Sequence, residues 1–134
     1  MTAITKIEGI GPAYAEKLKA AGISSVEALL ETGASPKGRK LLAESTGISD
    51  KLILEWVNRS DLFRVPGIGE EYSDLLESAG VDSVPELSQR KAENLHKKMI
   101  EVNDAKKIVR QLPSEKQVAA WIESAKTLPR VVQY

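Results

Sequence analysis

The chain carries one short pattern twice, and this repeat constrains the fold more than any other feature. Residues 7–11, Ile-Glu-Gly-Ile-Gly, recur at residues 65–69 as Val-Pro-Gly-Ile-Gly. Further matches follow at the same spacing: Tyr14 with Tyr72, Leu18 with Leu76, Ala21-Gly22 with Ala79-Gly80, Ser25-Val26 with Ser83-Val84, and Leu29 with Leu87. A unit this small does not bury a core alone, so the two copies are expected to pack as a pseudo-two-fold pair.

Helix start and stop signals are frequent in both halves. Pro12 suits the first position of a helix that runs to Ala21 and is stopped by Gly22, and Gly80 stops an equivalent helix over residues 70–79. Other helix starts are expected at a Ser24/Glu27 capping box (helix through Leu30), at Ser35-Pro36 (helix to Gly47), at Ser49-Asp50, at Asp82 or Ser83 (helix through Leu87), at Ala92 (helix to about Val102) and at a Ser114/Gln117 capping box (helix through Ile122). These signals predict an all-α fold.

The repeats suggest a boundary near the middle of the chain. We expect a first repeat over residues 1–64 and a second over residues 65–134, which share one core. Trp56-Val57 corresponds to Trp121-Ile122 at a wider spacing than the other matches, so the second repeat has extra residues between Leu87 and Ser114. The non-helical tail 128–134 is apolar enough that it should pack back on the body.

Composition narrows the class of function. Nineteen basic residues balance nineteen acidic ones, whereas strong nonspecific nucleic-acid binding usually needs a basic excess. The chain has no cysteine and a single histidine, His96. The residues needed for a zinc site or a Ser-His-Asp arrangement are therefore not all present. We find no catalytic constellation, cofactor motif, metal site or small-molecule site, and expect a cytoplasmic protein that is not an enzyme. No apolar run is long enough to span a membrane.

The repeated Gly-x-Gly segments suggest a phosphate contact. A turn with glycine at two positions has no side chain at its tip, and we expect Gly11 and its equivalent Gly69 to hold a backbone conformation that only glycine tolerates. The helix that follows points unpaired N–H groups and the positive end of its dipole outward, toward a possible phosphate oxygen. Ile10 and Ile68, between the glycines, are expected to anchor the turns in the core.

These residues resemble a known motif. Gly9-Ile10-Gly11, followed by Ala15 and Leu18, resembles the helix-hairpin-helix motif, and Gly67-Ile68-Gly69 with Ser73 and Leu76 repeats it. The chain is similar to the double helix-hairpin-helix domains of DNA repair and recombination proteins, and to small bacterial proteins of unknown function with two such motifs. The resemblance implies a pseudo-two-fold, SAM-like helical domain.

The resemblance also implies a ligand and the residues that contact it. The ligand is duplex DNA, bound weakly and without sequence preference through backbone N–H groups of the hairpins. The implied phosphate-binding residues are Gly9, Gly11 and Ala13 in the first copy, with charge added by Lys17 and Lys19, and Gly67, Gly69 and Glu71 in the second copy.

Charge distinguishes the two copies and leaves an alternative open. Glu70 and Glu71 place negative charge where a phosphate would lie, so the second copy is expected to be structural. Between residues 61 and 88, Arg64 is the only basic residue, which would suit a basic protein partner. A protein-interaction or scaffold module without nucleic-acid binding is therefore the alternative function.

Other candidate residues have structural explanations. Tyr14, Tyr72, Trp56 and Trp121 occur symmetrically at apolar helical positions and are interpreted as core. The basic residues of the second half alternate with acidic ones, as on a solvated helix face: Arg90, Lys91, Lys97, Lys98, Lys106, Lys107 and Arg110. Residues 36–40, Pro-Lys-Gly-Arg-Lys, are a further possible phosphate contact.

Overall fold

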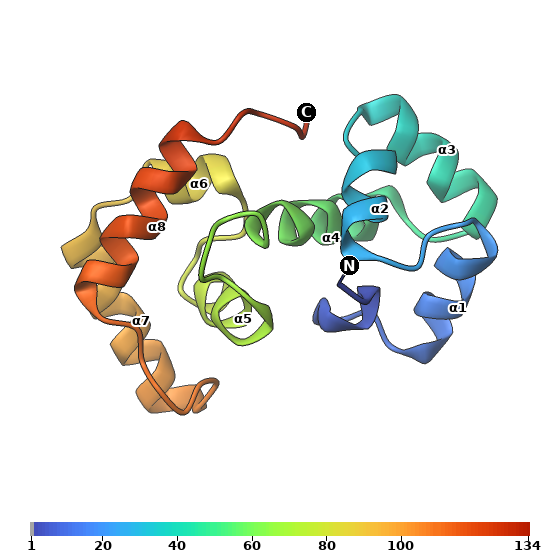
Figure 1. Cartoon of the computed structure of the whole chain (residues 1–134). Coiled ribbons are helices and arrows are strands. Elements are labelled where there is room, and N and C mark those ends of the chain that lie inside the picture. Colours follow the sequence, from blue (N-terminus) through green and yellow to red (C-terminus); the bar gives the residue numbers. More distant parts are fainter. Residues whose placement is uncertain (1) are drawn as a thin grey trace. The chain divides into compact units, whose positions relative to one another are not determined.

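The computed structural model describes residues 2–134 and is all-helical over that range (Figure 1). A 3-10 turn at Ile4–Lys6 precedes eight α-helices: α1 (Pro12–Ala20), α2 (Val26–Thr32), α3 (Pro36–Thr46), α4 (Asp50–Leu62), α5 (Glu70–Ser78), α6 (Val84–Ser88), α7 (Ala92–Lys106) and α8 (Glu115–Thr127). The predicted all-α class is confirmed. No helix within residues 2–134 is long and apolar enough to cross a membrane.

The chain divides into two compact units. The first comprises the chain up to Asp61 together with Arg130–Tyr134, and the second comprises Leu62–Pro129. The chain therefore enters the second unit near the expected boundary and returns to the first unit for its last residues. The shared core expected from the sequence remains a prediction.

Helix caps in the first unit explain where its helices begin. The Ser35 hydroxyl accepts a hydrogen bond from the Gly38 N–H at 3.0 Å and starts α3, and Gly47 ends it with φ of 75°. The expected Ser24/Glu27 capping box is wrong. Ser25 caps α2 by accepting from the Ala28 N–H at 3.1 Å. Glu27 instead accepts from the backbone N–H of Thr2 at 2.8 Å, and this bond lowers the pKa of its carboxyl group.

The second unit follows the predicted order, and α7 and α8 extend beyond their expected ends. Ser83, one of the two expected caps, starts α6, and Ser114 with Gln117 forms the predicted capping box of α8. Helix α7 extends past Val102 to Lys106, and Lys107 ends it in the left-handed conformation, with φ of 54°. The residues from Lys107 to Leu112 form a loop that contains no helix.

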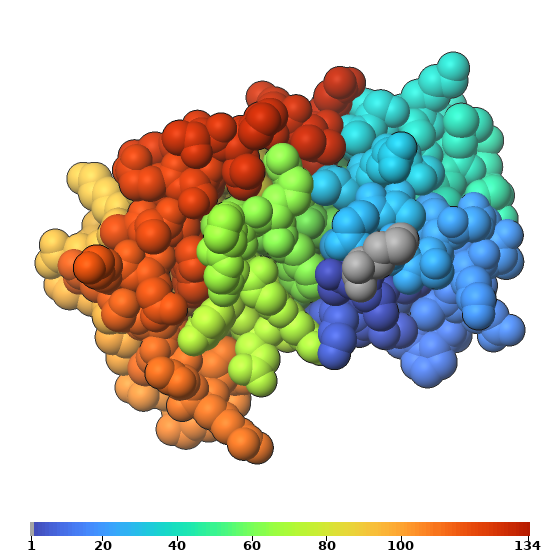
Figure 2. Space-filling model, viewed as in Figure 1, coloured from blue at the N-terminus to red at the C-terminus, as the bar shows by residue number. Residues whose placement is uncertain are grey.

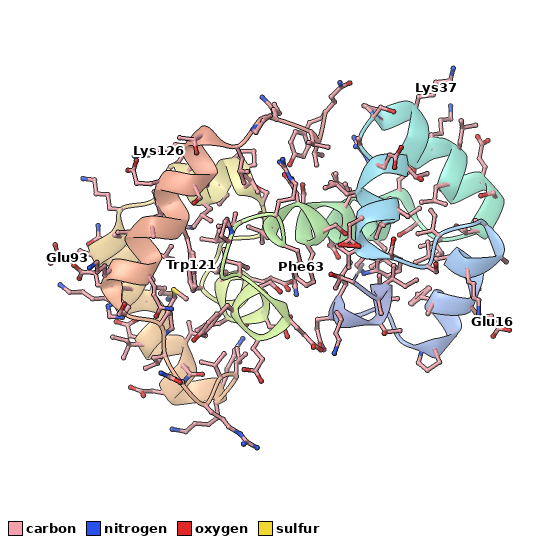
Figure 3. The ribbon with its side chains drawn as sticks, viewed as in Figure 1. Glu16, Lys37, Phe63, Glu93, Trp121 and Lys126 are labelled. Atoms are coloured by element: carbon pink, nitrogen blue, oxygen red, sulfur yellow. The ribbon has the colours of Figure 1, made fainter. Side chains whose placement is uncertain are left out.

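The core of the second unit is a single cluster of buried apolar side chains. It includes residues from all four helices, such as Leu75 of α5, Leu87 of α6, Met99 of α7 and Trp121 of α8. Figure 3 shows Trp121 pointing from α8 into this unit. Trp56 occupies the equivalent position in the first unit, and each tryptophan is only 3% exposed, so the prediction that both belong to the core is confirmed.

Candidate nucleic-acid interface

The first glycine turn, residues 7–11, is held by short-range contacts. The Ile10 N–H donates to the Ile7 carbonyl at 3.1 Å, and both isoleucines are buried. Gly9 adopts φ of 96°, which side chains rarely tolerate, whereas Gly11 has an ordinary extended conformation and precedes α1. The expectation that Gly11 needs to be glycine for its backbone angle is therefore wrong. The constraint lies at Gly9.

The second glycine turn, residues 65–69, repeats this geometry. The Ile68 N–H donates to the Val65 carbonyl at 3.1 Å, Gly67 has φ of 91°, and Gly69 is extended and precedes α5. The expectation for Gly69 is wrong for the same reason as that for Gly11. Both Ile10 and Ile68 are 4% exposed, so the predicted anchoring of the turns in the core is confirmed.

An aromatic pair lies beneath each turn. The ring centroids of Tyr14 and Trp56 are 5.1 Å apart, and those of Tyr72 and Trp121 are 5.2 Å apart. The indole nitrogen of each tryptophan lies close to the first glycine of its turn: a Cβ on Gly9 would be 3.4 Å from that of Trp56. The tyrosines are half-buried packing residues, so the sequence interpretation of all four aromatic residues agrees with their positions.

Each glycine turn is followed by a helix start, where backbone N–H groups have no partner within the helix. The Ala15 N–H donates to the Gly11 carbonyl at 2.9 Å, so the preceding N–H groups of Ala13 and Tyr14 belong to the first turn of α1, which a helix leaves unpaired. Gly9, Gly11 and Ala13 are all exposed, and together they form the tip of the first turn. Unpaired N–H groups at a helix start can donate to an anion.

The two candidate lysines of the first unit do not share one face of α1. With about 100° of rotation per helical residue, Lys17 lies about 40° from Ala13 around the axis, whereas Lys19 lies about 120° away. Lys17 also has its ammonium group 5.8 Å from the centroid of the Tyr14 ring, which directs it along the helix face that carries the turn. Lys17 therefore lies on the face of α1 that carries the first turn, and Lys19 does not.

The second turn has a different electrostatic environment. Gly67, Gly69 and Glu71 are exposed, as are the carboxylates of Glu70 and Glu71 in the first turn of α5. The turn borders a shallow depression of about 560 Å³ that is lined by Gly69, Glu70, Glu71, Tyr72, Arg110 and Gln111. The carboxylates at this helix start oppose binding of a phosphate, and Arg110 is the only positive charge that lines the depression.

Sequence reasoning missed the place of Arg110. It grouped this residue with the solvated basic helix face of the second half, whereas the loop after α7 brings it to the second turn. The Tyr72 hydroxyl donates to the Gln111 carbonyl at 3.1 Å and holds the loop there. The signal that pointed to this loop was the extra length of the second repeat between Leu87 and Ser114.

Other basic candidates are engaged within the protein. Residues 36–40 form the start of α3. The guanidinium of Arg39 is buried against carbonyl oxygens, so the expectation that Arg39 contacts a phosphate is wrong. Arg90 pairs with Glu86 at 2.9 Å and donates to the Gly80 carbonyl. Among residues 2–134, no three His, Asp or Glu side chains are grouped so that they could hold a metal ion.

These features define the class of protein: an all-helical chain of two units, each with a glycine turn followed by a helix. The model of the family described as "Domain of unknown function (DUF4332)" matches residues 8–128, and the chain belongs to that family. No curated protein and no solved structure matches the chain.

Proposed function

We propose that the two units are tandem helix-hairpin-helix motifs in a small, non-catalytic module that binds duplex DNA weakly and without sequence preference. The observation that carries the proposal is the duplicated turn. Gly9 and Gly67 share a positive φ, and each turn leads directly into a helix start with an exposed tip. Such a helix start favours an anion through its N–H groups and its dipole.

The first turn is the working contact in this proposal. Its tip has no side chain larger than the Ala13 methyl group and the Pro12 ring, and Lys17 adds positive charge on the same face of α1. The second turn contributes less because Glu70 and Glu71 repel a phosphate at the start of α5. Few phosphates are then neutralised, so we expect a dissociation constant weaker than about micromolar at physiological salt and a shallow salt dependence.

Charge reversal at the second turn tests the proposal. Glu70→Lys with Glu71→Lys turns a repelling helix start into an attracting one, so affinity for a random-sequence duplex should rise on the order of tenfold at low salt. The log–log salt slope should steepen by about −0.9 for each phosphate gained. Fluorescence anisotropy with a labelled duplex over a range of salt concentrations measures both quantities.

A matched variant separates the local effect from net charge. Glu93→Lys with Glu115→Lys makes the same change in net charge at two exposed positions in the first turns of α7 and α8, which belong to neither glycine turn and do not line the depression at the second turn. This control should gain clearly less affinity than the Glu70/Glu71 variant. Equal gains would mean that net charge, and not the turn, controls binding.

Charge reversal on α1 tests the first turn. Lys17→Glu with Lys19→Glu should abolish binding, and Lys17→Glu alone should account for most of the loss because of its position beside Ala13. If no variant binds duplex DNA at low salt, including Glu70→Lys with Glu71→Lys, the nucleic-acid proposal fails.

A protein-interaction module is the second candidate. The observation that favours it is the pair of exposed carboxylates at the start of α5, which would attract a basic protein surface. In that case Glu70→Lys with Glu71→Lys should weaken capture of a basic partner, while the native chain should give no DNA signal at low salt.

A further inference from the structure

The last residues of the chain occupy a defined site on the first unit. The Gln133 N–H donates to the Ala34 carbonyl at 2.7 Å, and the Gln133 carbonyl accepts from the Nη2 atom of Arg39 at 2.7 Å. The neighbouring Val132 is 1% exposed. The tail runs over the surface against the segment that carries α3 (Figures 1 and 2).

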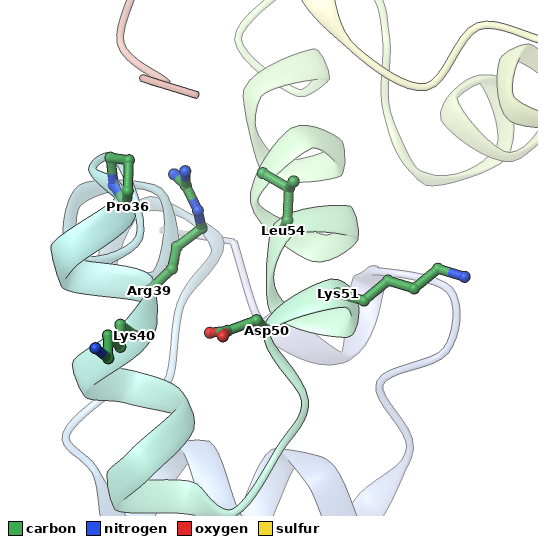
Figure 4. Close-up of a pocket in the computed structure, with 6 residues that line it drawn as sticks. All are labelled: Pro36, Arg39, Lys40, Asp50, Lys51 and Leu54. Atoms are coloured by element: carbon green, nitrogen blue, oxygen red, sulfur yellow. The ribbon is translucent and has the colours of Figure 1, made fainter.

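Arg39 is built into the first unit as a fixed donor. Its side chain extends from α3 (Figure 4), and Arg39 is only 7% exposed. The Nη1 atom donates to the Gly33 carbonyl at 2.8 Å and to the Ala34 carbonyl at 3.2 Å. These two bonds to residues outside the tail hold the guanidinium, and its Nη2 atom is the one that donates to the tail. Arg39 also lines the shallow depression of about 460 Å³ between α3 and α4.

The site contacts the backbone of the tail and two of its side chains. Both backbone groups of Gln133 are paired, while its side chain is exposed. Val132 is buried, and the Tyr134 hydroxyl donates to the side-chain oxygen of Asn58 on α4. Recognition of an extended backbone with pockets for alternate side chains is how proteins bind peptide strands. The bound segment therefore has the sequence pattern valine, any residue, tyrosine.

The tail has no helix and buries little apolar surface. Tyr134 is 53% exposed, and Val132 is the only tail side chain that is buried. Segments with few buried apolar contacts open locally at a small fraction of the cost of global unfolding. Opening of the tail would free the Nη2 donor of Arg39 and leave the Ala34 carbonyl, which still accepts from Nη1, with one position open to a new donor.

We propose that the first unit carries a binding site for an extended peptide of the pattern valine–any residue–tyrosine, which the chain's own residues 130–134 occupy reversibly. The fixed parts of the site are the Ala34 carbonyl, the Arg39 guanidinium and the Asn58 amide. This peptide site is separate from the glycine turns, and its test does not involve DNA.

Hydrogen exchange of the native chain tests reversibility. The Gln133 N–H should be protected relative to a free peptide, yet should exchange at least about tenfold faster than the buried amides of α4, such as those of Ile53 and Val57. Exchange of Gln133 together with the α4 amides would show that the tail opens only on global unfolding, and would overturn the proposal.

Binding in trans tests the site itself. The full chain with Val132→Asp should release its tail, and a labelled synthetic peptide of residues 129–134 should bind it at least about tenfold more tightly than it binds the native chain, whose own tail competes. Near-ultraviolet circular dichroism checks that the variant is folded. If it is not, the full chain with Gln133→Pro serves as the host, because proline removes the N–H donor and restricts the backbone at residues 132 and 133.

Modified peptides provide the matched controls. A peptide with Gln133→Ala should bind like the native peptide because that side chain is exposed, whereas N-methylation at Gln133 should weaken binding about tenfold by removing the donor to Ala34. Arg39→Ala in the host should weaken binding of the native peptide and of the Gln133→Ala peptide. Absence of binding to a folded host, or equal binding of the N-methylated peptide, would overturn the proposal.

Discussion

Two glycines, Gly9 and Gly67, set the shape of the glycine turns. Each adopts a positive φ in a turn above a buried tryptophan. The indole nitrogen of that tryptophan, Trp56 or Trp121, lies close to the glycine. A Cβ at Gly67 would be 3.0 Å from the Trp121 nitrogen, which is closer than packed side chains normally approach. The second glycine of each turn has neither constraint, since nothing lies within 4 Å of a Cβ at Gly11 or Gly69.

Serine substitutions at the second turn should separate these two roles. Gly67→Ser should lower the free energy of unfolding by about 1–3 kcal/mol, because serine is strained at this φ and its Cβ crowds Trp121. Gly69→Ser should be neutral or slightly stabilising, because serine is a favoured residue before a helix. Urea denaturation of both variants gives the comparison. Equal losses would contradict the assignment of the constraint to Gly67.

At this scale the sequence predicted the turn, but our prediction of the glycine that adopts the positive φ was wrong. Gly-x-Gly before a helix places both glycines in one turn, and we expected the positive φ at the second. That glycine is the N-cap of the helix, a position that is extended, and Gly11 also precedes Pro12, which favours the same conformation. The positive φ therefore lies at Gly9 and Gly67. The buried role of Ile10 and Ile68 was predictable because an apolar residue between two exposed glycines has few other places to go.

At the scale of elements, the loop after α7 distinguishes the second unit from the first. Asn103 is buried on α7 and closes two hydrogen bonds with Val109: its amide nitrogen donates to the Val109 carbonyl at 3.1 Å, and its oxygen accepts from the Val109 N–H at 2.9 Å. This pair folds the loop back, so that Arg110 and Gln111 reach the second turn.

Removing the Asn103 amide should destabilise the loop and its unit. Asn103→Ala leaves the buried N–H and carbonyl of Val109 unpaired, so the free energy of unfolding should fall by about 1–3 kcal/mol. Asn94→Ala is the matched control, because Asn94 lies exposed on the same helix and alanine is the better helix former. Chemical denaturation measures both. A loss at Asn94 as large as that at Asn103 would contradict this account of the loop.

Helix starts were more predictable than helix ends. Ser35, Ser83 and Ser114 cap their helices as expected because a hydroxyl followed by a helical pattern is a local signal. The end of α7 was predicted too early. Asn103 indicates a polar surface position by composition, and its burial is explained only by the loop that it binds. The approach of Arg110 to the second turn depends on the same tertiary contact.

At the scale of the whole molecule, the return of the tail was predictable and its docking site was not. The apolar residues of 128–134 indicated packing on the body. Which part of the body receives them depends on Arg39, a residue whose sequence context suggested a phosphate contact. A buried arginine bound only to carbonyl groups has no sequence signature, because its partners are backbone atoms of whatever residues lie nearby.

The shared core predicted by the repeat can be tested by dividing the chain. A fragment of residues 1–61 should be largely unfolded by far-ultraviolet circular dichroism, whereas the full chain should melt in one cooperative transition. A fragment of this length buries only about 60% of the surface that its unfolded chain exposes, which leaves little margin for stability. The fragment also lacks the tail, so the peptide of residues 129–134 is added as a control. The peptide should not restore helicity if the missing interactions are those of a core shared with the second half. A fragment that melts cooperatively near the temperature of the full chain would show that the first unit folds on a core of its own.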